Sequence, residues 1–412
     1  MLLVLLVLAQ IPFIYRRYET GKLADKIAQL DAGRTNYADP NFKEYKGIIH
    51  AHTNLGGHST GSFDELIAAA NANDLDFVLM TEHYSETFDT AAQTLNGVYG
   101  KTLFVGGNEI DTSDGDRFLL IPGGGKAARV RMSGTTAFIN AAHDSNQLAL
   151  ITYPEKFKSW DSQFDGIEVF SLHTAAKSMN WLTALGDLIW SYPSYPELTL
   201  AKNFQRPDAN LAKFDEIAEQ RKISLFAGTD AHSNIGFHMF GDDAGNKLIN
   251  IKVDPYATIF RIARIHVLLP AVAEFTQGTL IEAIRNGHYF IAFDALGDAS
   301  NFTFRVEPIR LPTEIMGSEG NIDPPARMRA VENEPDVAMD DPPTNRLIAI
   351  APTQARFVLY KDGERLTEQS GSVELNVEVE KAGTYRVEVY RDDLGPPFDK
   401  IPWIISNPIY VR

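Results

Sequence analysis

The feature that most constrains this chain is a set of histidines and carboxylates placed directly after short apolar segments. The first set lies in residues 45–62 (YKGIIHAHTNLGGHSTGS), where an apolar stretch leads into His50-Ala51-His52, and His58 follows after a Gly-Gly turn. Alternate residues of a strand point to the same side, so His50 and His52 can present two imidazoles together at a strand end. The pattern has two interpretations: three metal ligands, or one buried structural histidine and two surface histidines. A His-x-His pair at a strand end with a third histidine on the next loop favours the metal ligands.

Two further apolar segments end in the same kind of residue. Residues 75–81 (LDFVLMT) precede Glu82-His83, and residues 223–228 precede Thr229-Asp230-Ala231-His232. Between the first two sets, Ser62 and Glu65 form a capping box that predicts a helix through residue 71. Three predicted strand ends therefore carry His-x-His, Glu-His and Asp-x-His.

From residue 46 onward, strand and helix patterns alternate, which predicts a parallel sheet with helices outside it. The seven predicted strands are 46–50, 76–81, 102–106, 117–121, 148–152, 166–170 and 223–228. Each runs into a polar or glycine-containing loop, as in a barrel whose site lies at the carboxyl ends of the strands. The aromatic-rich residues 171–222 predict two or three helices, which either cover the barrel or form a lid or substrate wall. Residues 276–288 predict a helix capped by Gly287.

From Asn301 the apolar period changes to two, and Asp362-Gly363 is a turn signal. This pattern predicts a small β-sandwich over residues 300–412. Residues 318–346 are rich in Pro, Asp and Glu and are predicted to be a mobile loop or linker. The length of 412 residues allows two or three domains.

Charge and cysteine content exclude several functions. The net charge of −16 argues against nonspecific nucleic-acid binding, which needs a basic surface. The absence of cysteine removes disulfides, thiolate nucleophiles and cysteine zinc sites, and it selects neither redox compartment.

Residues 1–14 (MLLVLLVLAQIPFI) are nearly all apolar and are followed by Tyr15-Arg16-Arg17. The run is shorter than the roughly 20 apolar residues of a spanning helix, and it lacks a basic n-region and a clear cleavage site. We interpret it as an export signal or membrane anchor, with a buried helix as the alternative, and residues 15–44 as a polar tether. The expected location is the bacterial envelope, exported or membrane-anchored; a cytoplasmic location is the alternative.

The motifs HAHT, TEH, GGNEI and GTDAH occur in an order that resembles the polymerase and histidinol phosphatase (PHP) family of metal-dependent hydrolases. The resemblance covers roughly residues 45–299. It implies an α/β fold in which seven strands form a (β/α) PHP barrel, a distorted version of the TIM barrel. The C-terminal segment ending in PWIISNPIYV looks like that of the carbaryl hydrolase-like branch.

The resemblance also implies a ligand set. His50, His52, Glu109 and Asp230 would hold one divalent ion, and His58, His83 and His232 a second, with zinc, manganese or iron as the metal. From the residues alone, Glu109 has the alternative of binding a backbone N–H, and Asp230 that of capping a helix. Glu82 stands where the family has aspartate, and we expect it to support catalysis by holding the imidazole of a ligand rather than by binding metal itself.

Members of the PHP family that bind a third metal have two more histidines as its ligands. In this chain, the corresponding positions fall at Asp116-Arg117 and at Tyr153. We therefore predict two metals per chain, with the third site degraded. Tyr153 would donate a hydrogen bond to substrate or to a bridging water. Asp116 retains an oxygen ligand, and Arg117 would bind an anionic group. His173, just beyond residues 166–170, either faces the site or lies outside its rim.

Two metals about 4 Å apart can share a hydroxide that serves as the nucleophile. The leading hypothesis is a phosphoesterase that acts on a small-molecule ester. The alternatives are a hydrolase of an uncharged ester, amide or carbamate, and a non-catalytic ligand-binding or envelope module.

Overall fold

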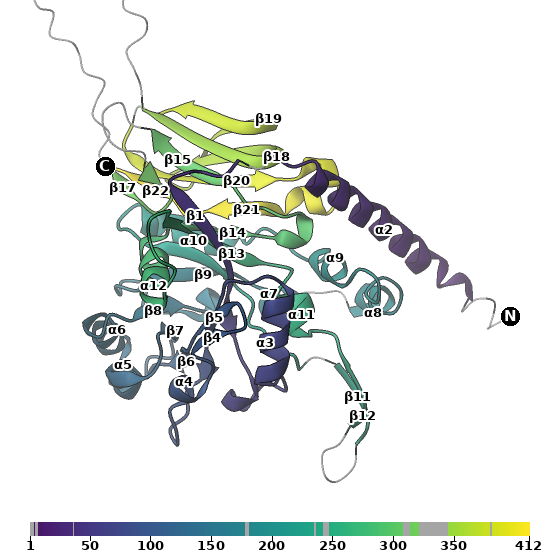
Figure 1. Cartoon of the computed structure of the whole chain (residues 1–412), viewed down its shortest axis with the longest axis horizontal. Coiled ribbons are helices and arrows are strands. Elements are labelled where there is room, and N and C mark those ends of the chain that lie inside the picture. Colours follow the sequence, from purple (N-terminus) through teal and green to yellow (C-terminus); the bar gives the residue numbers. More distant parts are fainter. Residues whose placement is uncertain are drawn as a thin grey trace, which may run out of the picture.

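The computed structural model shows a mixed α/β protein with two large sheets and a two-stranded hairpin (Figure 1). It describes residues 4, 7–35, 37–177, 181–234, 236–241, 247–307, 314–320, 345–379 and 381–412. The site is positioned by the strands in residues 42–228, which carry the predicted metal ligands at their ends.

All seven predicted strands are present. They are β1 (Phe42–Ala51), β2 (Phe77–Met80), β5 (Thr102–Val105), β7 (Arg117–Ile121), β8 (Leu148–Ile151), β9 (Gly166–Ser171) and β10 (Ser224–Gly228). The sequence pattern missed two short extensions, β3 (Glu82–His83) and β6 (Asn108–Asp111), which directly follow β2 and β5. These extensions carry His83 and Glu109, so ligand residues lie on strands as well as on the loops that follow them.

The pairing is parallel from β1 to β2 to β5, from β3 to β6, and from β8 through β9 to β10. Strand β7 is antiparallel to both β6 and β8, so the prediction of a wholly parallel sheet is wrong at this strand. The physical reason is the short connection of residues 112–116, which allows a hairpin but no crossover. At the far end, the Thr229 N–H donates to the Ile49 carbonyl at 3.0 Å and a parallel bridge joins Ala51 to Ala231.

Helices flank these strands and include the two that the sequence predicted best. Helix α3 (Phe63–Ala72) begins at the capping box, in which Ser62 and Glu65 exchange hydrogen bonds of 3.2 and 3.1 Å. Helix α12 (Gln277–Asn286) ends at Gly287 in the left-handed conformation, with φ 73°. The prediction of two or three helices in residues 171–222 is too low, because the described residues there form four: α7 (Leu172–Lys177), α8 (Trp181–Trp190), α9 (Pro196–Ala201) and α10 (Asp208–Ala218). The remaining short helices are α4 (Thr90–Gln93), α5 (Gly125–Val130), α6 (Thr135–Asp144) and α11 (Tyr256–Ile259).

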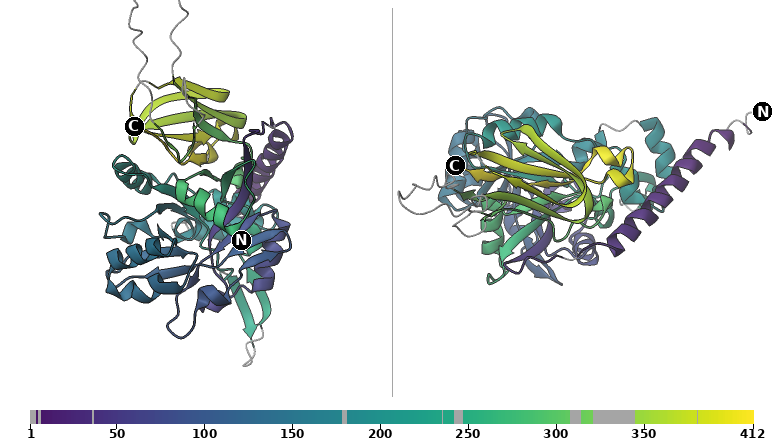
Figure 2. Two further views of the ribbon diagram at one scale, coloured as in Figure 1. Left: turned by 60° about the vertical axis from the view of Figure 1, so that its left-hand side comes forward. Right: turned by 90° about the horizontal axis from the view of Figure 1, so that it is seen from above.

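The strands after residue 300 continue the first sheet through hydrogen bonds. From β1 the order runs through β13 (Arg264–Pro270), β14 (Tyr289–Ala292), β21 (Pro402–Ser406), β20 (Gly383–Tyr390), β18 (Arg346–Lys361) and β15 (Thr303–Glu307) to β16 (Glu314–Ile315). Strand β19 (Glu364–Glu378) pairs with β18. Strand β22 (Ile409–Val411) lies between β20 and β17 (Glu319–Gly320) and pairs with both. At the other end of the sheet, β4 (Gly97–Tyr99) pairs with β5. Figures 1 and 2 show this yellow-green part stacked on the blue-green body.

Strands β13 and β14 were not predicted, although they connect the two parts of the sheet. Both are buried along nearly their whole length, so Val267-Leu268-Leu269 shows no alternation of apolar and polar residues that would identify a strand. The hairpin of β11 (Gly236–Gly241) and β12 (Lys247–Lys252) extends from the body just after His232 (Figure 1).

Two predictions fall largely or partly outside the described residues: the linker at 318–346 and the apolar segment at 1–14. Within the described part, α2 (Ile11–Ala32) leads away from the body toward the N-terminus (Figure 1). Its inner side packs on α8, where Arg16 pairs with Asp187 and the Trp190 indole donates to Gln10 at 2.9 Å. None of the described helices combines the length and apolar character needed to cross a bilayer.

Candidate metal centre

Four predicted ligands come together at one place. His50 and His52 lie at the end of β1, Glu109 on β6, and Asp230 just after β10. All four side chains are buried, and one nitrogen or oxygen from each lies within 4.8 Å of the others. The structure thus gathers the set that the resemblance implies for the first metal.

The atoms that face one another in this group make no hydrogen bond with any described residue, although Glu109 Oε2 also lies near His83 and Asp230 Oδ1 near His232. His50 Nε2, His52 Nε2, Glu109 Oε2 and Asp230 Oδ1 are buried and accept or donate no hydrogen bond among the described residues. His50 Nε2 and His52 Nε2 are each 3.3 Å from Asp230 Oδ1, and His52 Nε2 is 3.4 Å from Glu109 Oε2. Buried polar atoms without partners are costly. Their convergence, and their nitrogen and oxygen chemistry, fit a divalent transition-metal ion.

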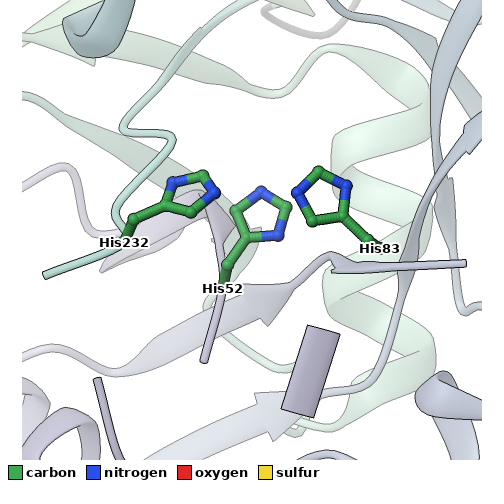
Figure 3. Close-up of side chains that lie close together, drawn as sticks. All are labelled: His52, His83 and His232. Atoms are coloured by element: carbon green, nitrogen blue, oxygen red, sulfur yellow. The ribbon is translucent and has the colours of Figure 1, made fainter. Parts of the chain in front are cut away.

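A second group consists of His52, His83 and His232, whose nitrogens also lie within 4.8 Å of one another. Figure 3 shows the three rings side by side, with His52 in the middle; its ring centroid is 4.6 Å from that of His83 and 4.3 Å from that of His232. Glu109 Oε2 is 3.1 Å from His83 Nδ1, so this carboxylate lies between the two groups.

His58, which is expected in the second set with His83 and His232, is not part of this group. Its side chain is exposed and belongs to neither group, although its ring meets that of His83 edge-on at 4.8 Å. The turn at residues 54–57 holds His58 at the mouth of the site, and His52 takes its place in the group.

The backbone at the site is strained. His50, Tyr153 and Asp230 all have positive φ, at 73°, 52° and 47°. Side chains of this size rarely adopt that conformation, and such residues concentrate at functional sites. Strand β1 has a register shift between Ile49 and Ala51, so His50 and His52 converge through a bulge rather than through regular alternation.

Glu168, which the sequence reasoning did not single out, supports His50. Glu168 Oε1 lies 2.8 Å from His50 Nδ1, and both side chains are buried. The Thr152 hydroxyl donates to the other oxygen of Glu168. A carboxylate on Nδ1 fixes the imidazole so that Nε2 faces the metal. The available signal was a charged residue inside the apolar strand GIEVF, because a buried carboxylate requires a partner.

His52 and Glu109 have the protonation states that metal ligands need, and His50 carries a proton that a metal would displace. Burial lowers the pKa of His52 to about 3, which keeps it neutral. Burial opposes ionisation of Glu109, but His50, His52 and His83 hold its pKa at about 2. Burial also acts to lower the pKa of His50, yet the carboxylates of Glu168, Asp230 and Glu109 raise it well above its usual value. The carboxylates around His50 stabilise a positive charge on its ring, so they would also stabilise a bound cation at this position.

Tyr153 donates its hydroxyl hydrogen to Asp230 Oδ2 at 2.7 Å, while Asp230 Oδ1 faces the histidines. Burial and the neighbouring Asp230 raise the pKa of the Tyr153 phenol. The predicted hydrogen-bond donor therefore acts on a ligand carboxylate in this structure.

The other predicted residues lie elsewhere. The buried Glu82 carboxylate accepts hydrogen bonds from Thr53 N, Thr53 Oγ1 and Thr94 Oγ1 at 2.6–3.1 Å. It fixes the loop after β1 instead of an imidazole, which corrects its expected role. Asp116 accepts from Lys158 N, Thr135 Oγ1 and Ser159 Oγ and belongs to neither ligand group. His173 is in α7, and its side chain is outside the described part of the chain.

A cleft of about 560 Å³ opens onto the metal centre. It is lined by His58, His83, Tyr84, Glu86, Glu109, Asp111, Arg117 and Arg131. The predicted Arg117 is therefore beside the site, and Arg131 was missed. Arg117 Nη1 donates to Glu109 Oε1 at 3.3 Å, whereas Glu109 Oε2 faces His52 and His83.

No protein-family model and no curated protein matches the chain. Among solved structures, it is similar to PsfC from Pseudomonas syringae PB-5123, with 13% identity, 58% of this chain and 88% of that chain covered, and a TM-score of 0.35. It is also similar to a two-domain protein containing a predicted PHP-like metal-dependent phosphoesterase from Bacteroides vulgatus ATCC 8482. That match has 11% identity, coverage of 90% of this chain and 98% of the other, and a TM-score of 0.37. Likeness at this level carries no argument about function, which must be judged from the residues of the site.

Proposed function

We propose that this chain is a metal-dependent hydrolase of the PHP type that cleaves a phosphoester of a small molecule. The observation that carries the proposal is the convergence of four buried ligand atoms of His50, His52, Glu109 and Asp230 that make no hydrogen bond within the described part of the chain. A structural role for these residues would leave each atom with a hydrogen-bond partner, as Asp116 has.

His50, His52, Glu109 and Asp230 would hold one ion, and His83 and His232 would hold a second with His52 or Glu109. When bound, two such ions would supply an ionised water near neutral pH and would neutralise charge on the substrate. Glu168 orients His50, Tyr153 orients Asp230, and Arg117 holds the outer oxygen of Glu109.

In the reaction the water oxygen forms a bond to phosphorus and the ester P–O bond breaks. The leaving alcohol oxygen, released into the open cleft, takes its proton from solvent, and the products are an alcohol and a phosphate. No side-chain nucleophile is needed, which agrees with a chain without cysteine.

The experiment is a metal analysis combined with a turnover panel on one preparation. We expect about two divalent ions per chain and hydrolysis of phosphate esters, and we expect the double variant His50→Ala/His52→Ala to lose most of both. Full metal content and unchanged turnover in the double variant would refute the site. Turnover of neutral esters alone would support the carbamate or carboxylester alternative, and bound metal without turnover would support a binding module.

The proposal includes the scaffold. The strands β1-β2-β5 pair in one sheet and β3-β6-β7-β8-β9-β10 in the other. Because β3 and β6 follow β2 and β5 along the chain, and because a bridge joins Ala51 to Ala231, this arrangement supports a closed seven-stranded barrel in residues 45–299. We assign residues 300–412 to a separate β-unit, although hydrogen bonds between β14 and β21 join it to the barrel.

We also propose that the N-terminal segment attaches the protein to a membrane surface. An apolar stripe with helical spacing is exposed on α2 at Ile11, Ile14, Tyr15 and Tyr18, and the described apolar residues before it, Val4, Val7 and Leu8, are exposed as well; all seven are 45–62% exposed. The stripe continues the apolar run of residues 1–14 and ends beside the exposed Arg17 and Lys22, as in helices that lie in a bilayer interface.

Binding of the full chain to anionic vesicles should be lost in Ile11→Glu and retained in the control Val272→Glu. Val272 is an apolar residue in another part of the chain and is 99% exposed. Equal binding of both variants, or none by the unaltered chain, would refute the attachment.

A further inference from the structure

The cleft beside the metal centre contains two arginines from separate elements. Arg117 is the first residue of β7, and Arg131 is the first residue after α5. Both line the same cavity as His83 and Glu109, the ligand residues that face it. Two guanidiniums therefore lie in one cleft at the metal centre, together with the carboxylates of Glu86, Glu109 and Asp111.

Each guanidinium is held in place by an acidic residue. Arg117 Nε and Nη2 donate to the two oxygens of Asp111 at 2.6 and 2.9 Å. Arg131 Nη2 donates to Glu86 at 2.8 Å, and the Arg131 guanidinium lies over the Tyr84 ring at 4.6 Å. Asp111 and Glu86 have side chains 55% and 79% exposed. Water screens such exposed pairs, so they orient the arginines without removing much of their affinity for another anion.

Arg117 retains unused donors. A guanidinium has five N–H groups, and three of those on Arg117 are engaged by Asp111 and Glu109. The remaining two, one on each terminal nitrogen, have no acceptor among the described residues. A planar fork with two such donors matches two oxygens of a phosphoryl group better than a single carbonyl oxygen.

We propose that Arg117, assisted by Arg131, forms an anion subsite that makes a phosphate monoester the substrate. The inference rests on the proposed function. A phosphate monoester has three non-bridging oxygens, a diester has two, and a carboxylic ester or carbamate has one carbonyl oxygen. A two-metal site can take two oxygens, so only the monoester has a third oxygen for Arg117. Arg117 is thus a specificity-determining residue as well as a support for Glu109.

The test compares Arg117→Met, Arg117→Lys and Arg131→Met with the control Arg129→Met. Arg129 is exposed on α5, does not line the cleft, and loses the same charge two residues from Arg131. The probes are p-nitrophenyl phosphate, bis-p-nitrophenyl phosphate, p-nitrophenyl acetate and inhibition by inorganic phosphate. Metal content is measured for every variant.

We expect Arg117→Met to raise KM for the monoester and Ki for inorganic phosphate by about 10- to 100-fold, the factor for one charge-assisted hydrogen bond. Arg117→Lys should recover only part of this, because lysine lacks the fork, and Arg131→Met should have a smaller effect. Because Arg117 also donates to Glu109, Arg117→Met should lower metal affinity and neutral-ester turnover to some extent, but far less than it lowers phosphate affinity. The control Arg129→Met should match the unaltered protein in every measurement.

Two results would overturn the subsite: unchanged phosphate affinity in Arg117→Met, or an equal loss on all substrates together with lost metal. The second result would show that Arg117 only holds Glu109. If the unaltered, metal-loaded protein hydrolyses no phosphate ester at all, the proposed function fails instead of the subsite.

Discussion

Replacing Glu168 with glutamine tests whether the carboxylate behind His50 tunes the metal centre. The substitution keeps the volume of the side chain and its ability to accept from Thr152, but it removes the charge 2.8 Å from His50 Nδ1. Loss of such an outer partner usually lowers metal affinity 10- to 100-fold, which corresponds to about 1.4 to 2.8 kcal/mol of binding free energy. We expect the upper part of this range because both side chains are fully buried.

The assay is a competition titration against a chromophoric chelator, with a thermal melt of the metal-free protein to confirm folding. Glu44→Gln is the matched control. Glu44 Oε1 contacts His266 Nδ1 at 2.6 Å in the same kind of pair, outside both ligand groups. That variant should keep its metal affinity. An affinity of Glu168→Gln within a factor of two of the unaltered protein, with the fold intact, would refute the role of Glu168.

Three further outcomes are expected from the contacts. Tyr153→Phe should weaken metal binding about 10-fold, because Asp230 loses its orienting donor; unchanged affinity with slower turnover would show that the phenol acts on substrate instead. Gly228→Ala should abolish metal binding, since a Cβ there would lie 1.6 Å from Glu168 Oε1, and a normal metal content would contradict this. Burial acts to lower the pKa of His266, but Asp294 and Glu44 raise it to about 9. Protonated His266 therefore contributes about 3 kcal/mol to the free energy of unfolding below pH 6.5, and this contribution is lost as pH rises through 9. Denaturant titrations at several pH values should show this fall in the unaltered protein and not in His266→Gln.

The strands and the principal ligands could be predicted because their signals are local. Short apolar segments followed by His50-Ala51-His52, His83 and Asp230 identify strand ends, and seven such segments became seven strands. The capping box at Ser62 identified the start of α3 for the same reason, because a cap is made within a single turn.

Strand direction was less accessible to sequence reasoning. The apolar composition of β7 is that of its neighbours, and only the length of the preceding connection sets it antiparallel. Strand β14 lacks an alternating pattern, and β13 has one only over Arg264–Val267. Both faces of these strands are buried, and burial on two faces is a property of the assembled sheets.

The sequence by itself determined which residue types the site contains, since histidines and carboxylates at strand ends have few other uses. Only the tertiary structure decided their partners. Glu168 meets His50 across 118 positions, Tyr153 meets Asp230 across 77, and His58 is held outside the group that His52 completes. A hydrogen bond or a metal site depends on where atoms lie in space to within fractions of an ångström, and that placement results from how the strands pack and from the strained backbone at His50, not from the local order of residues.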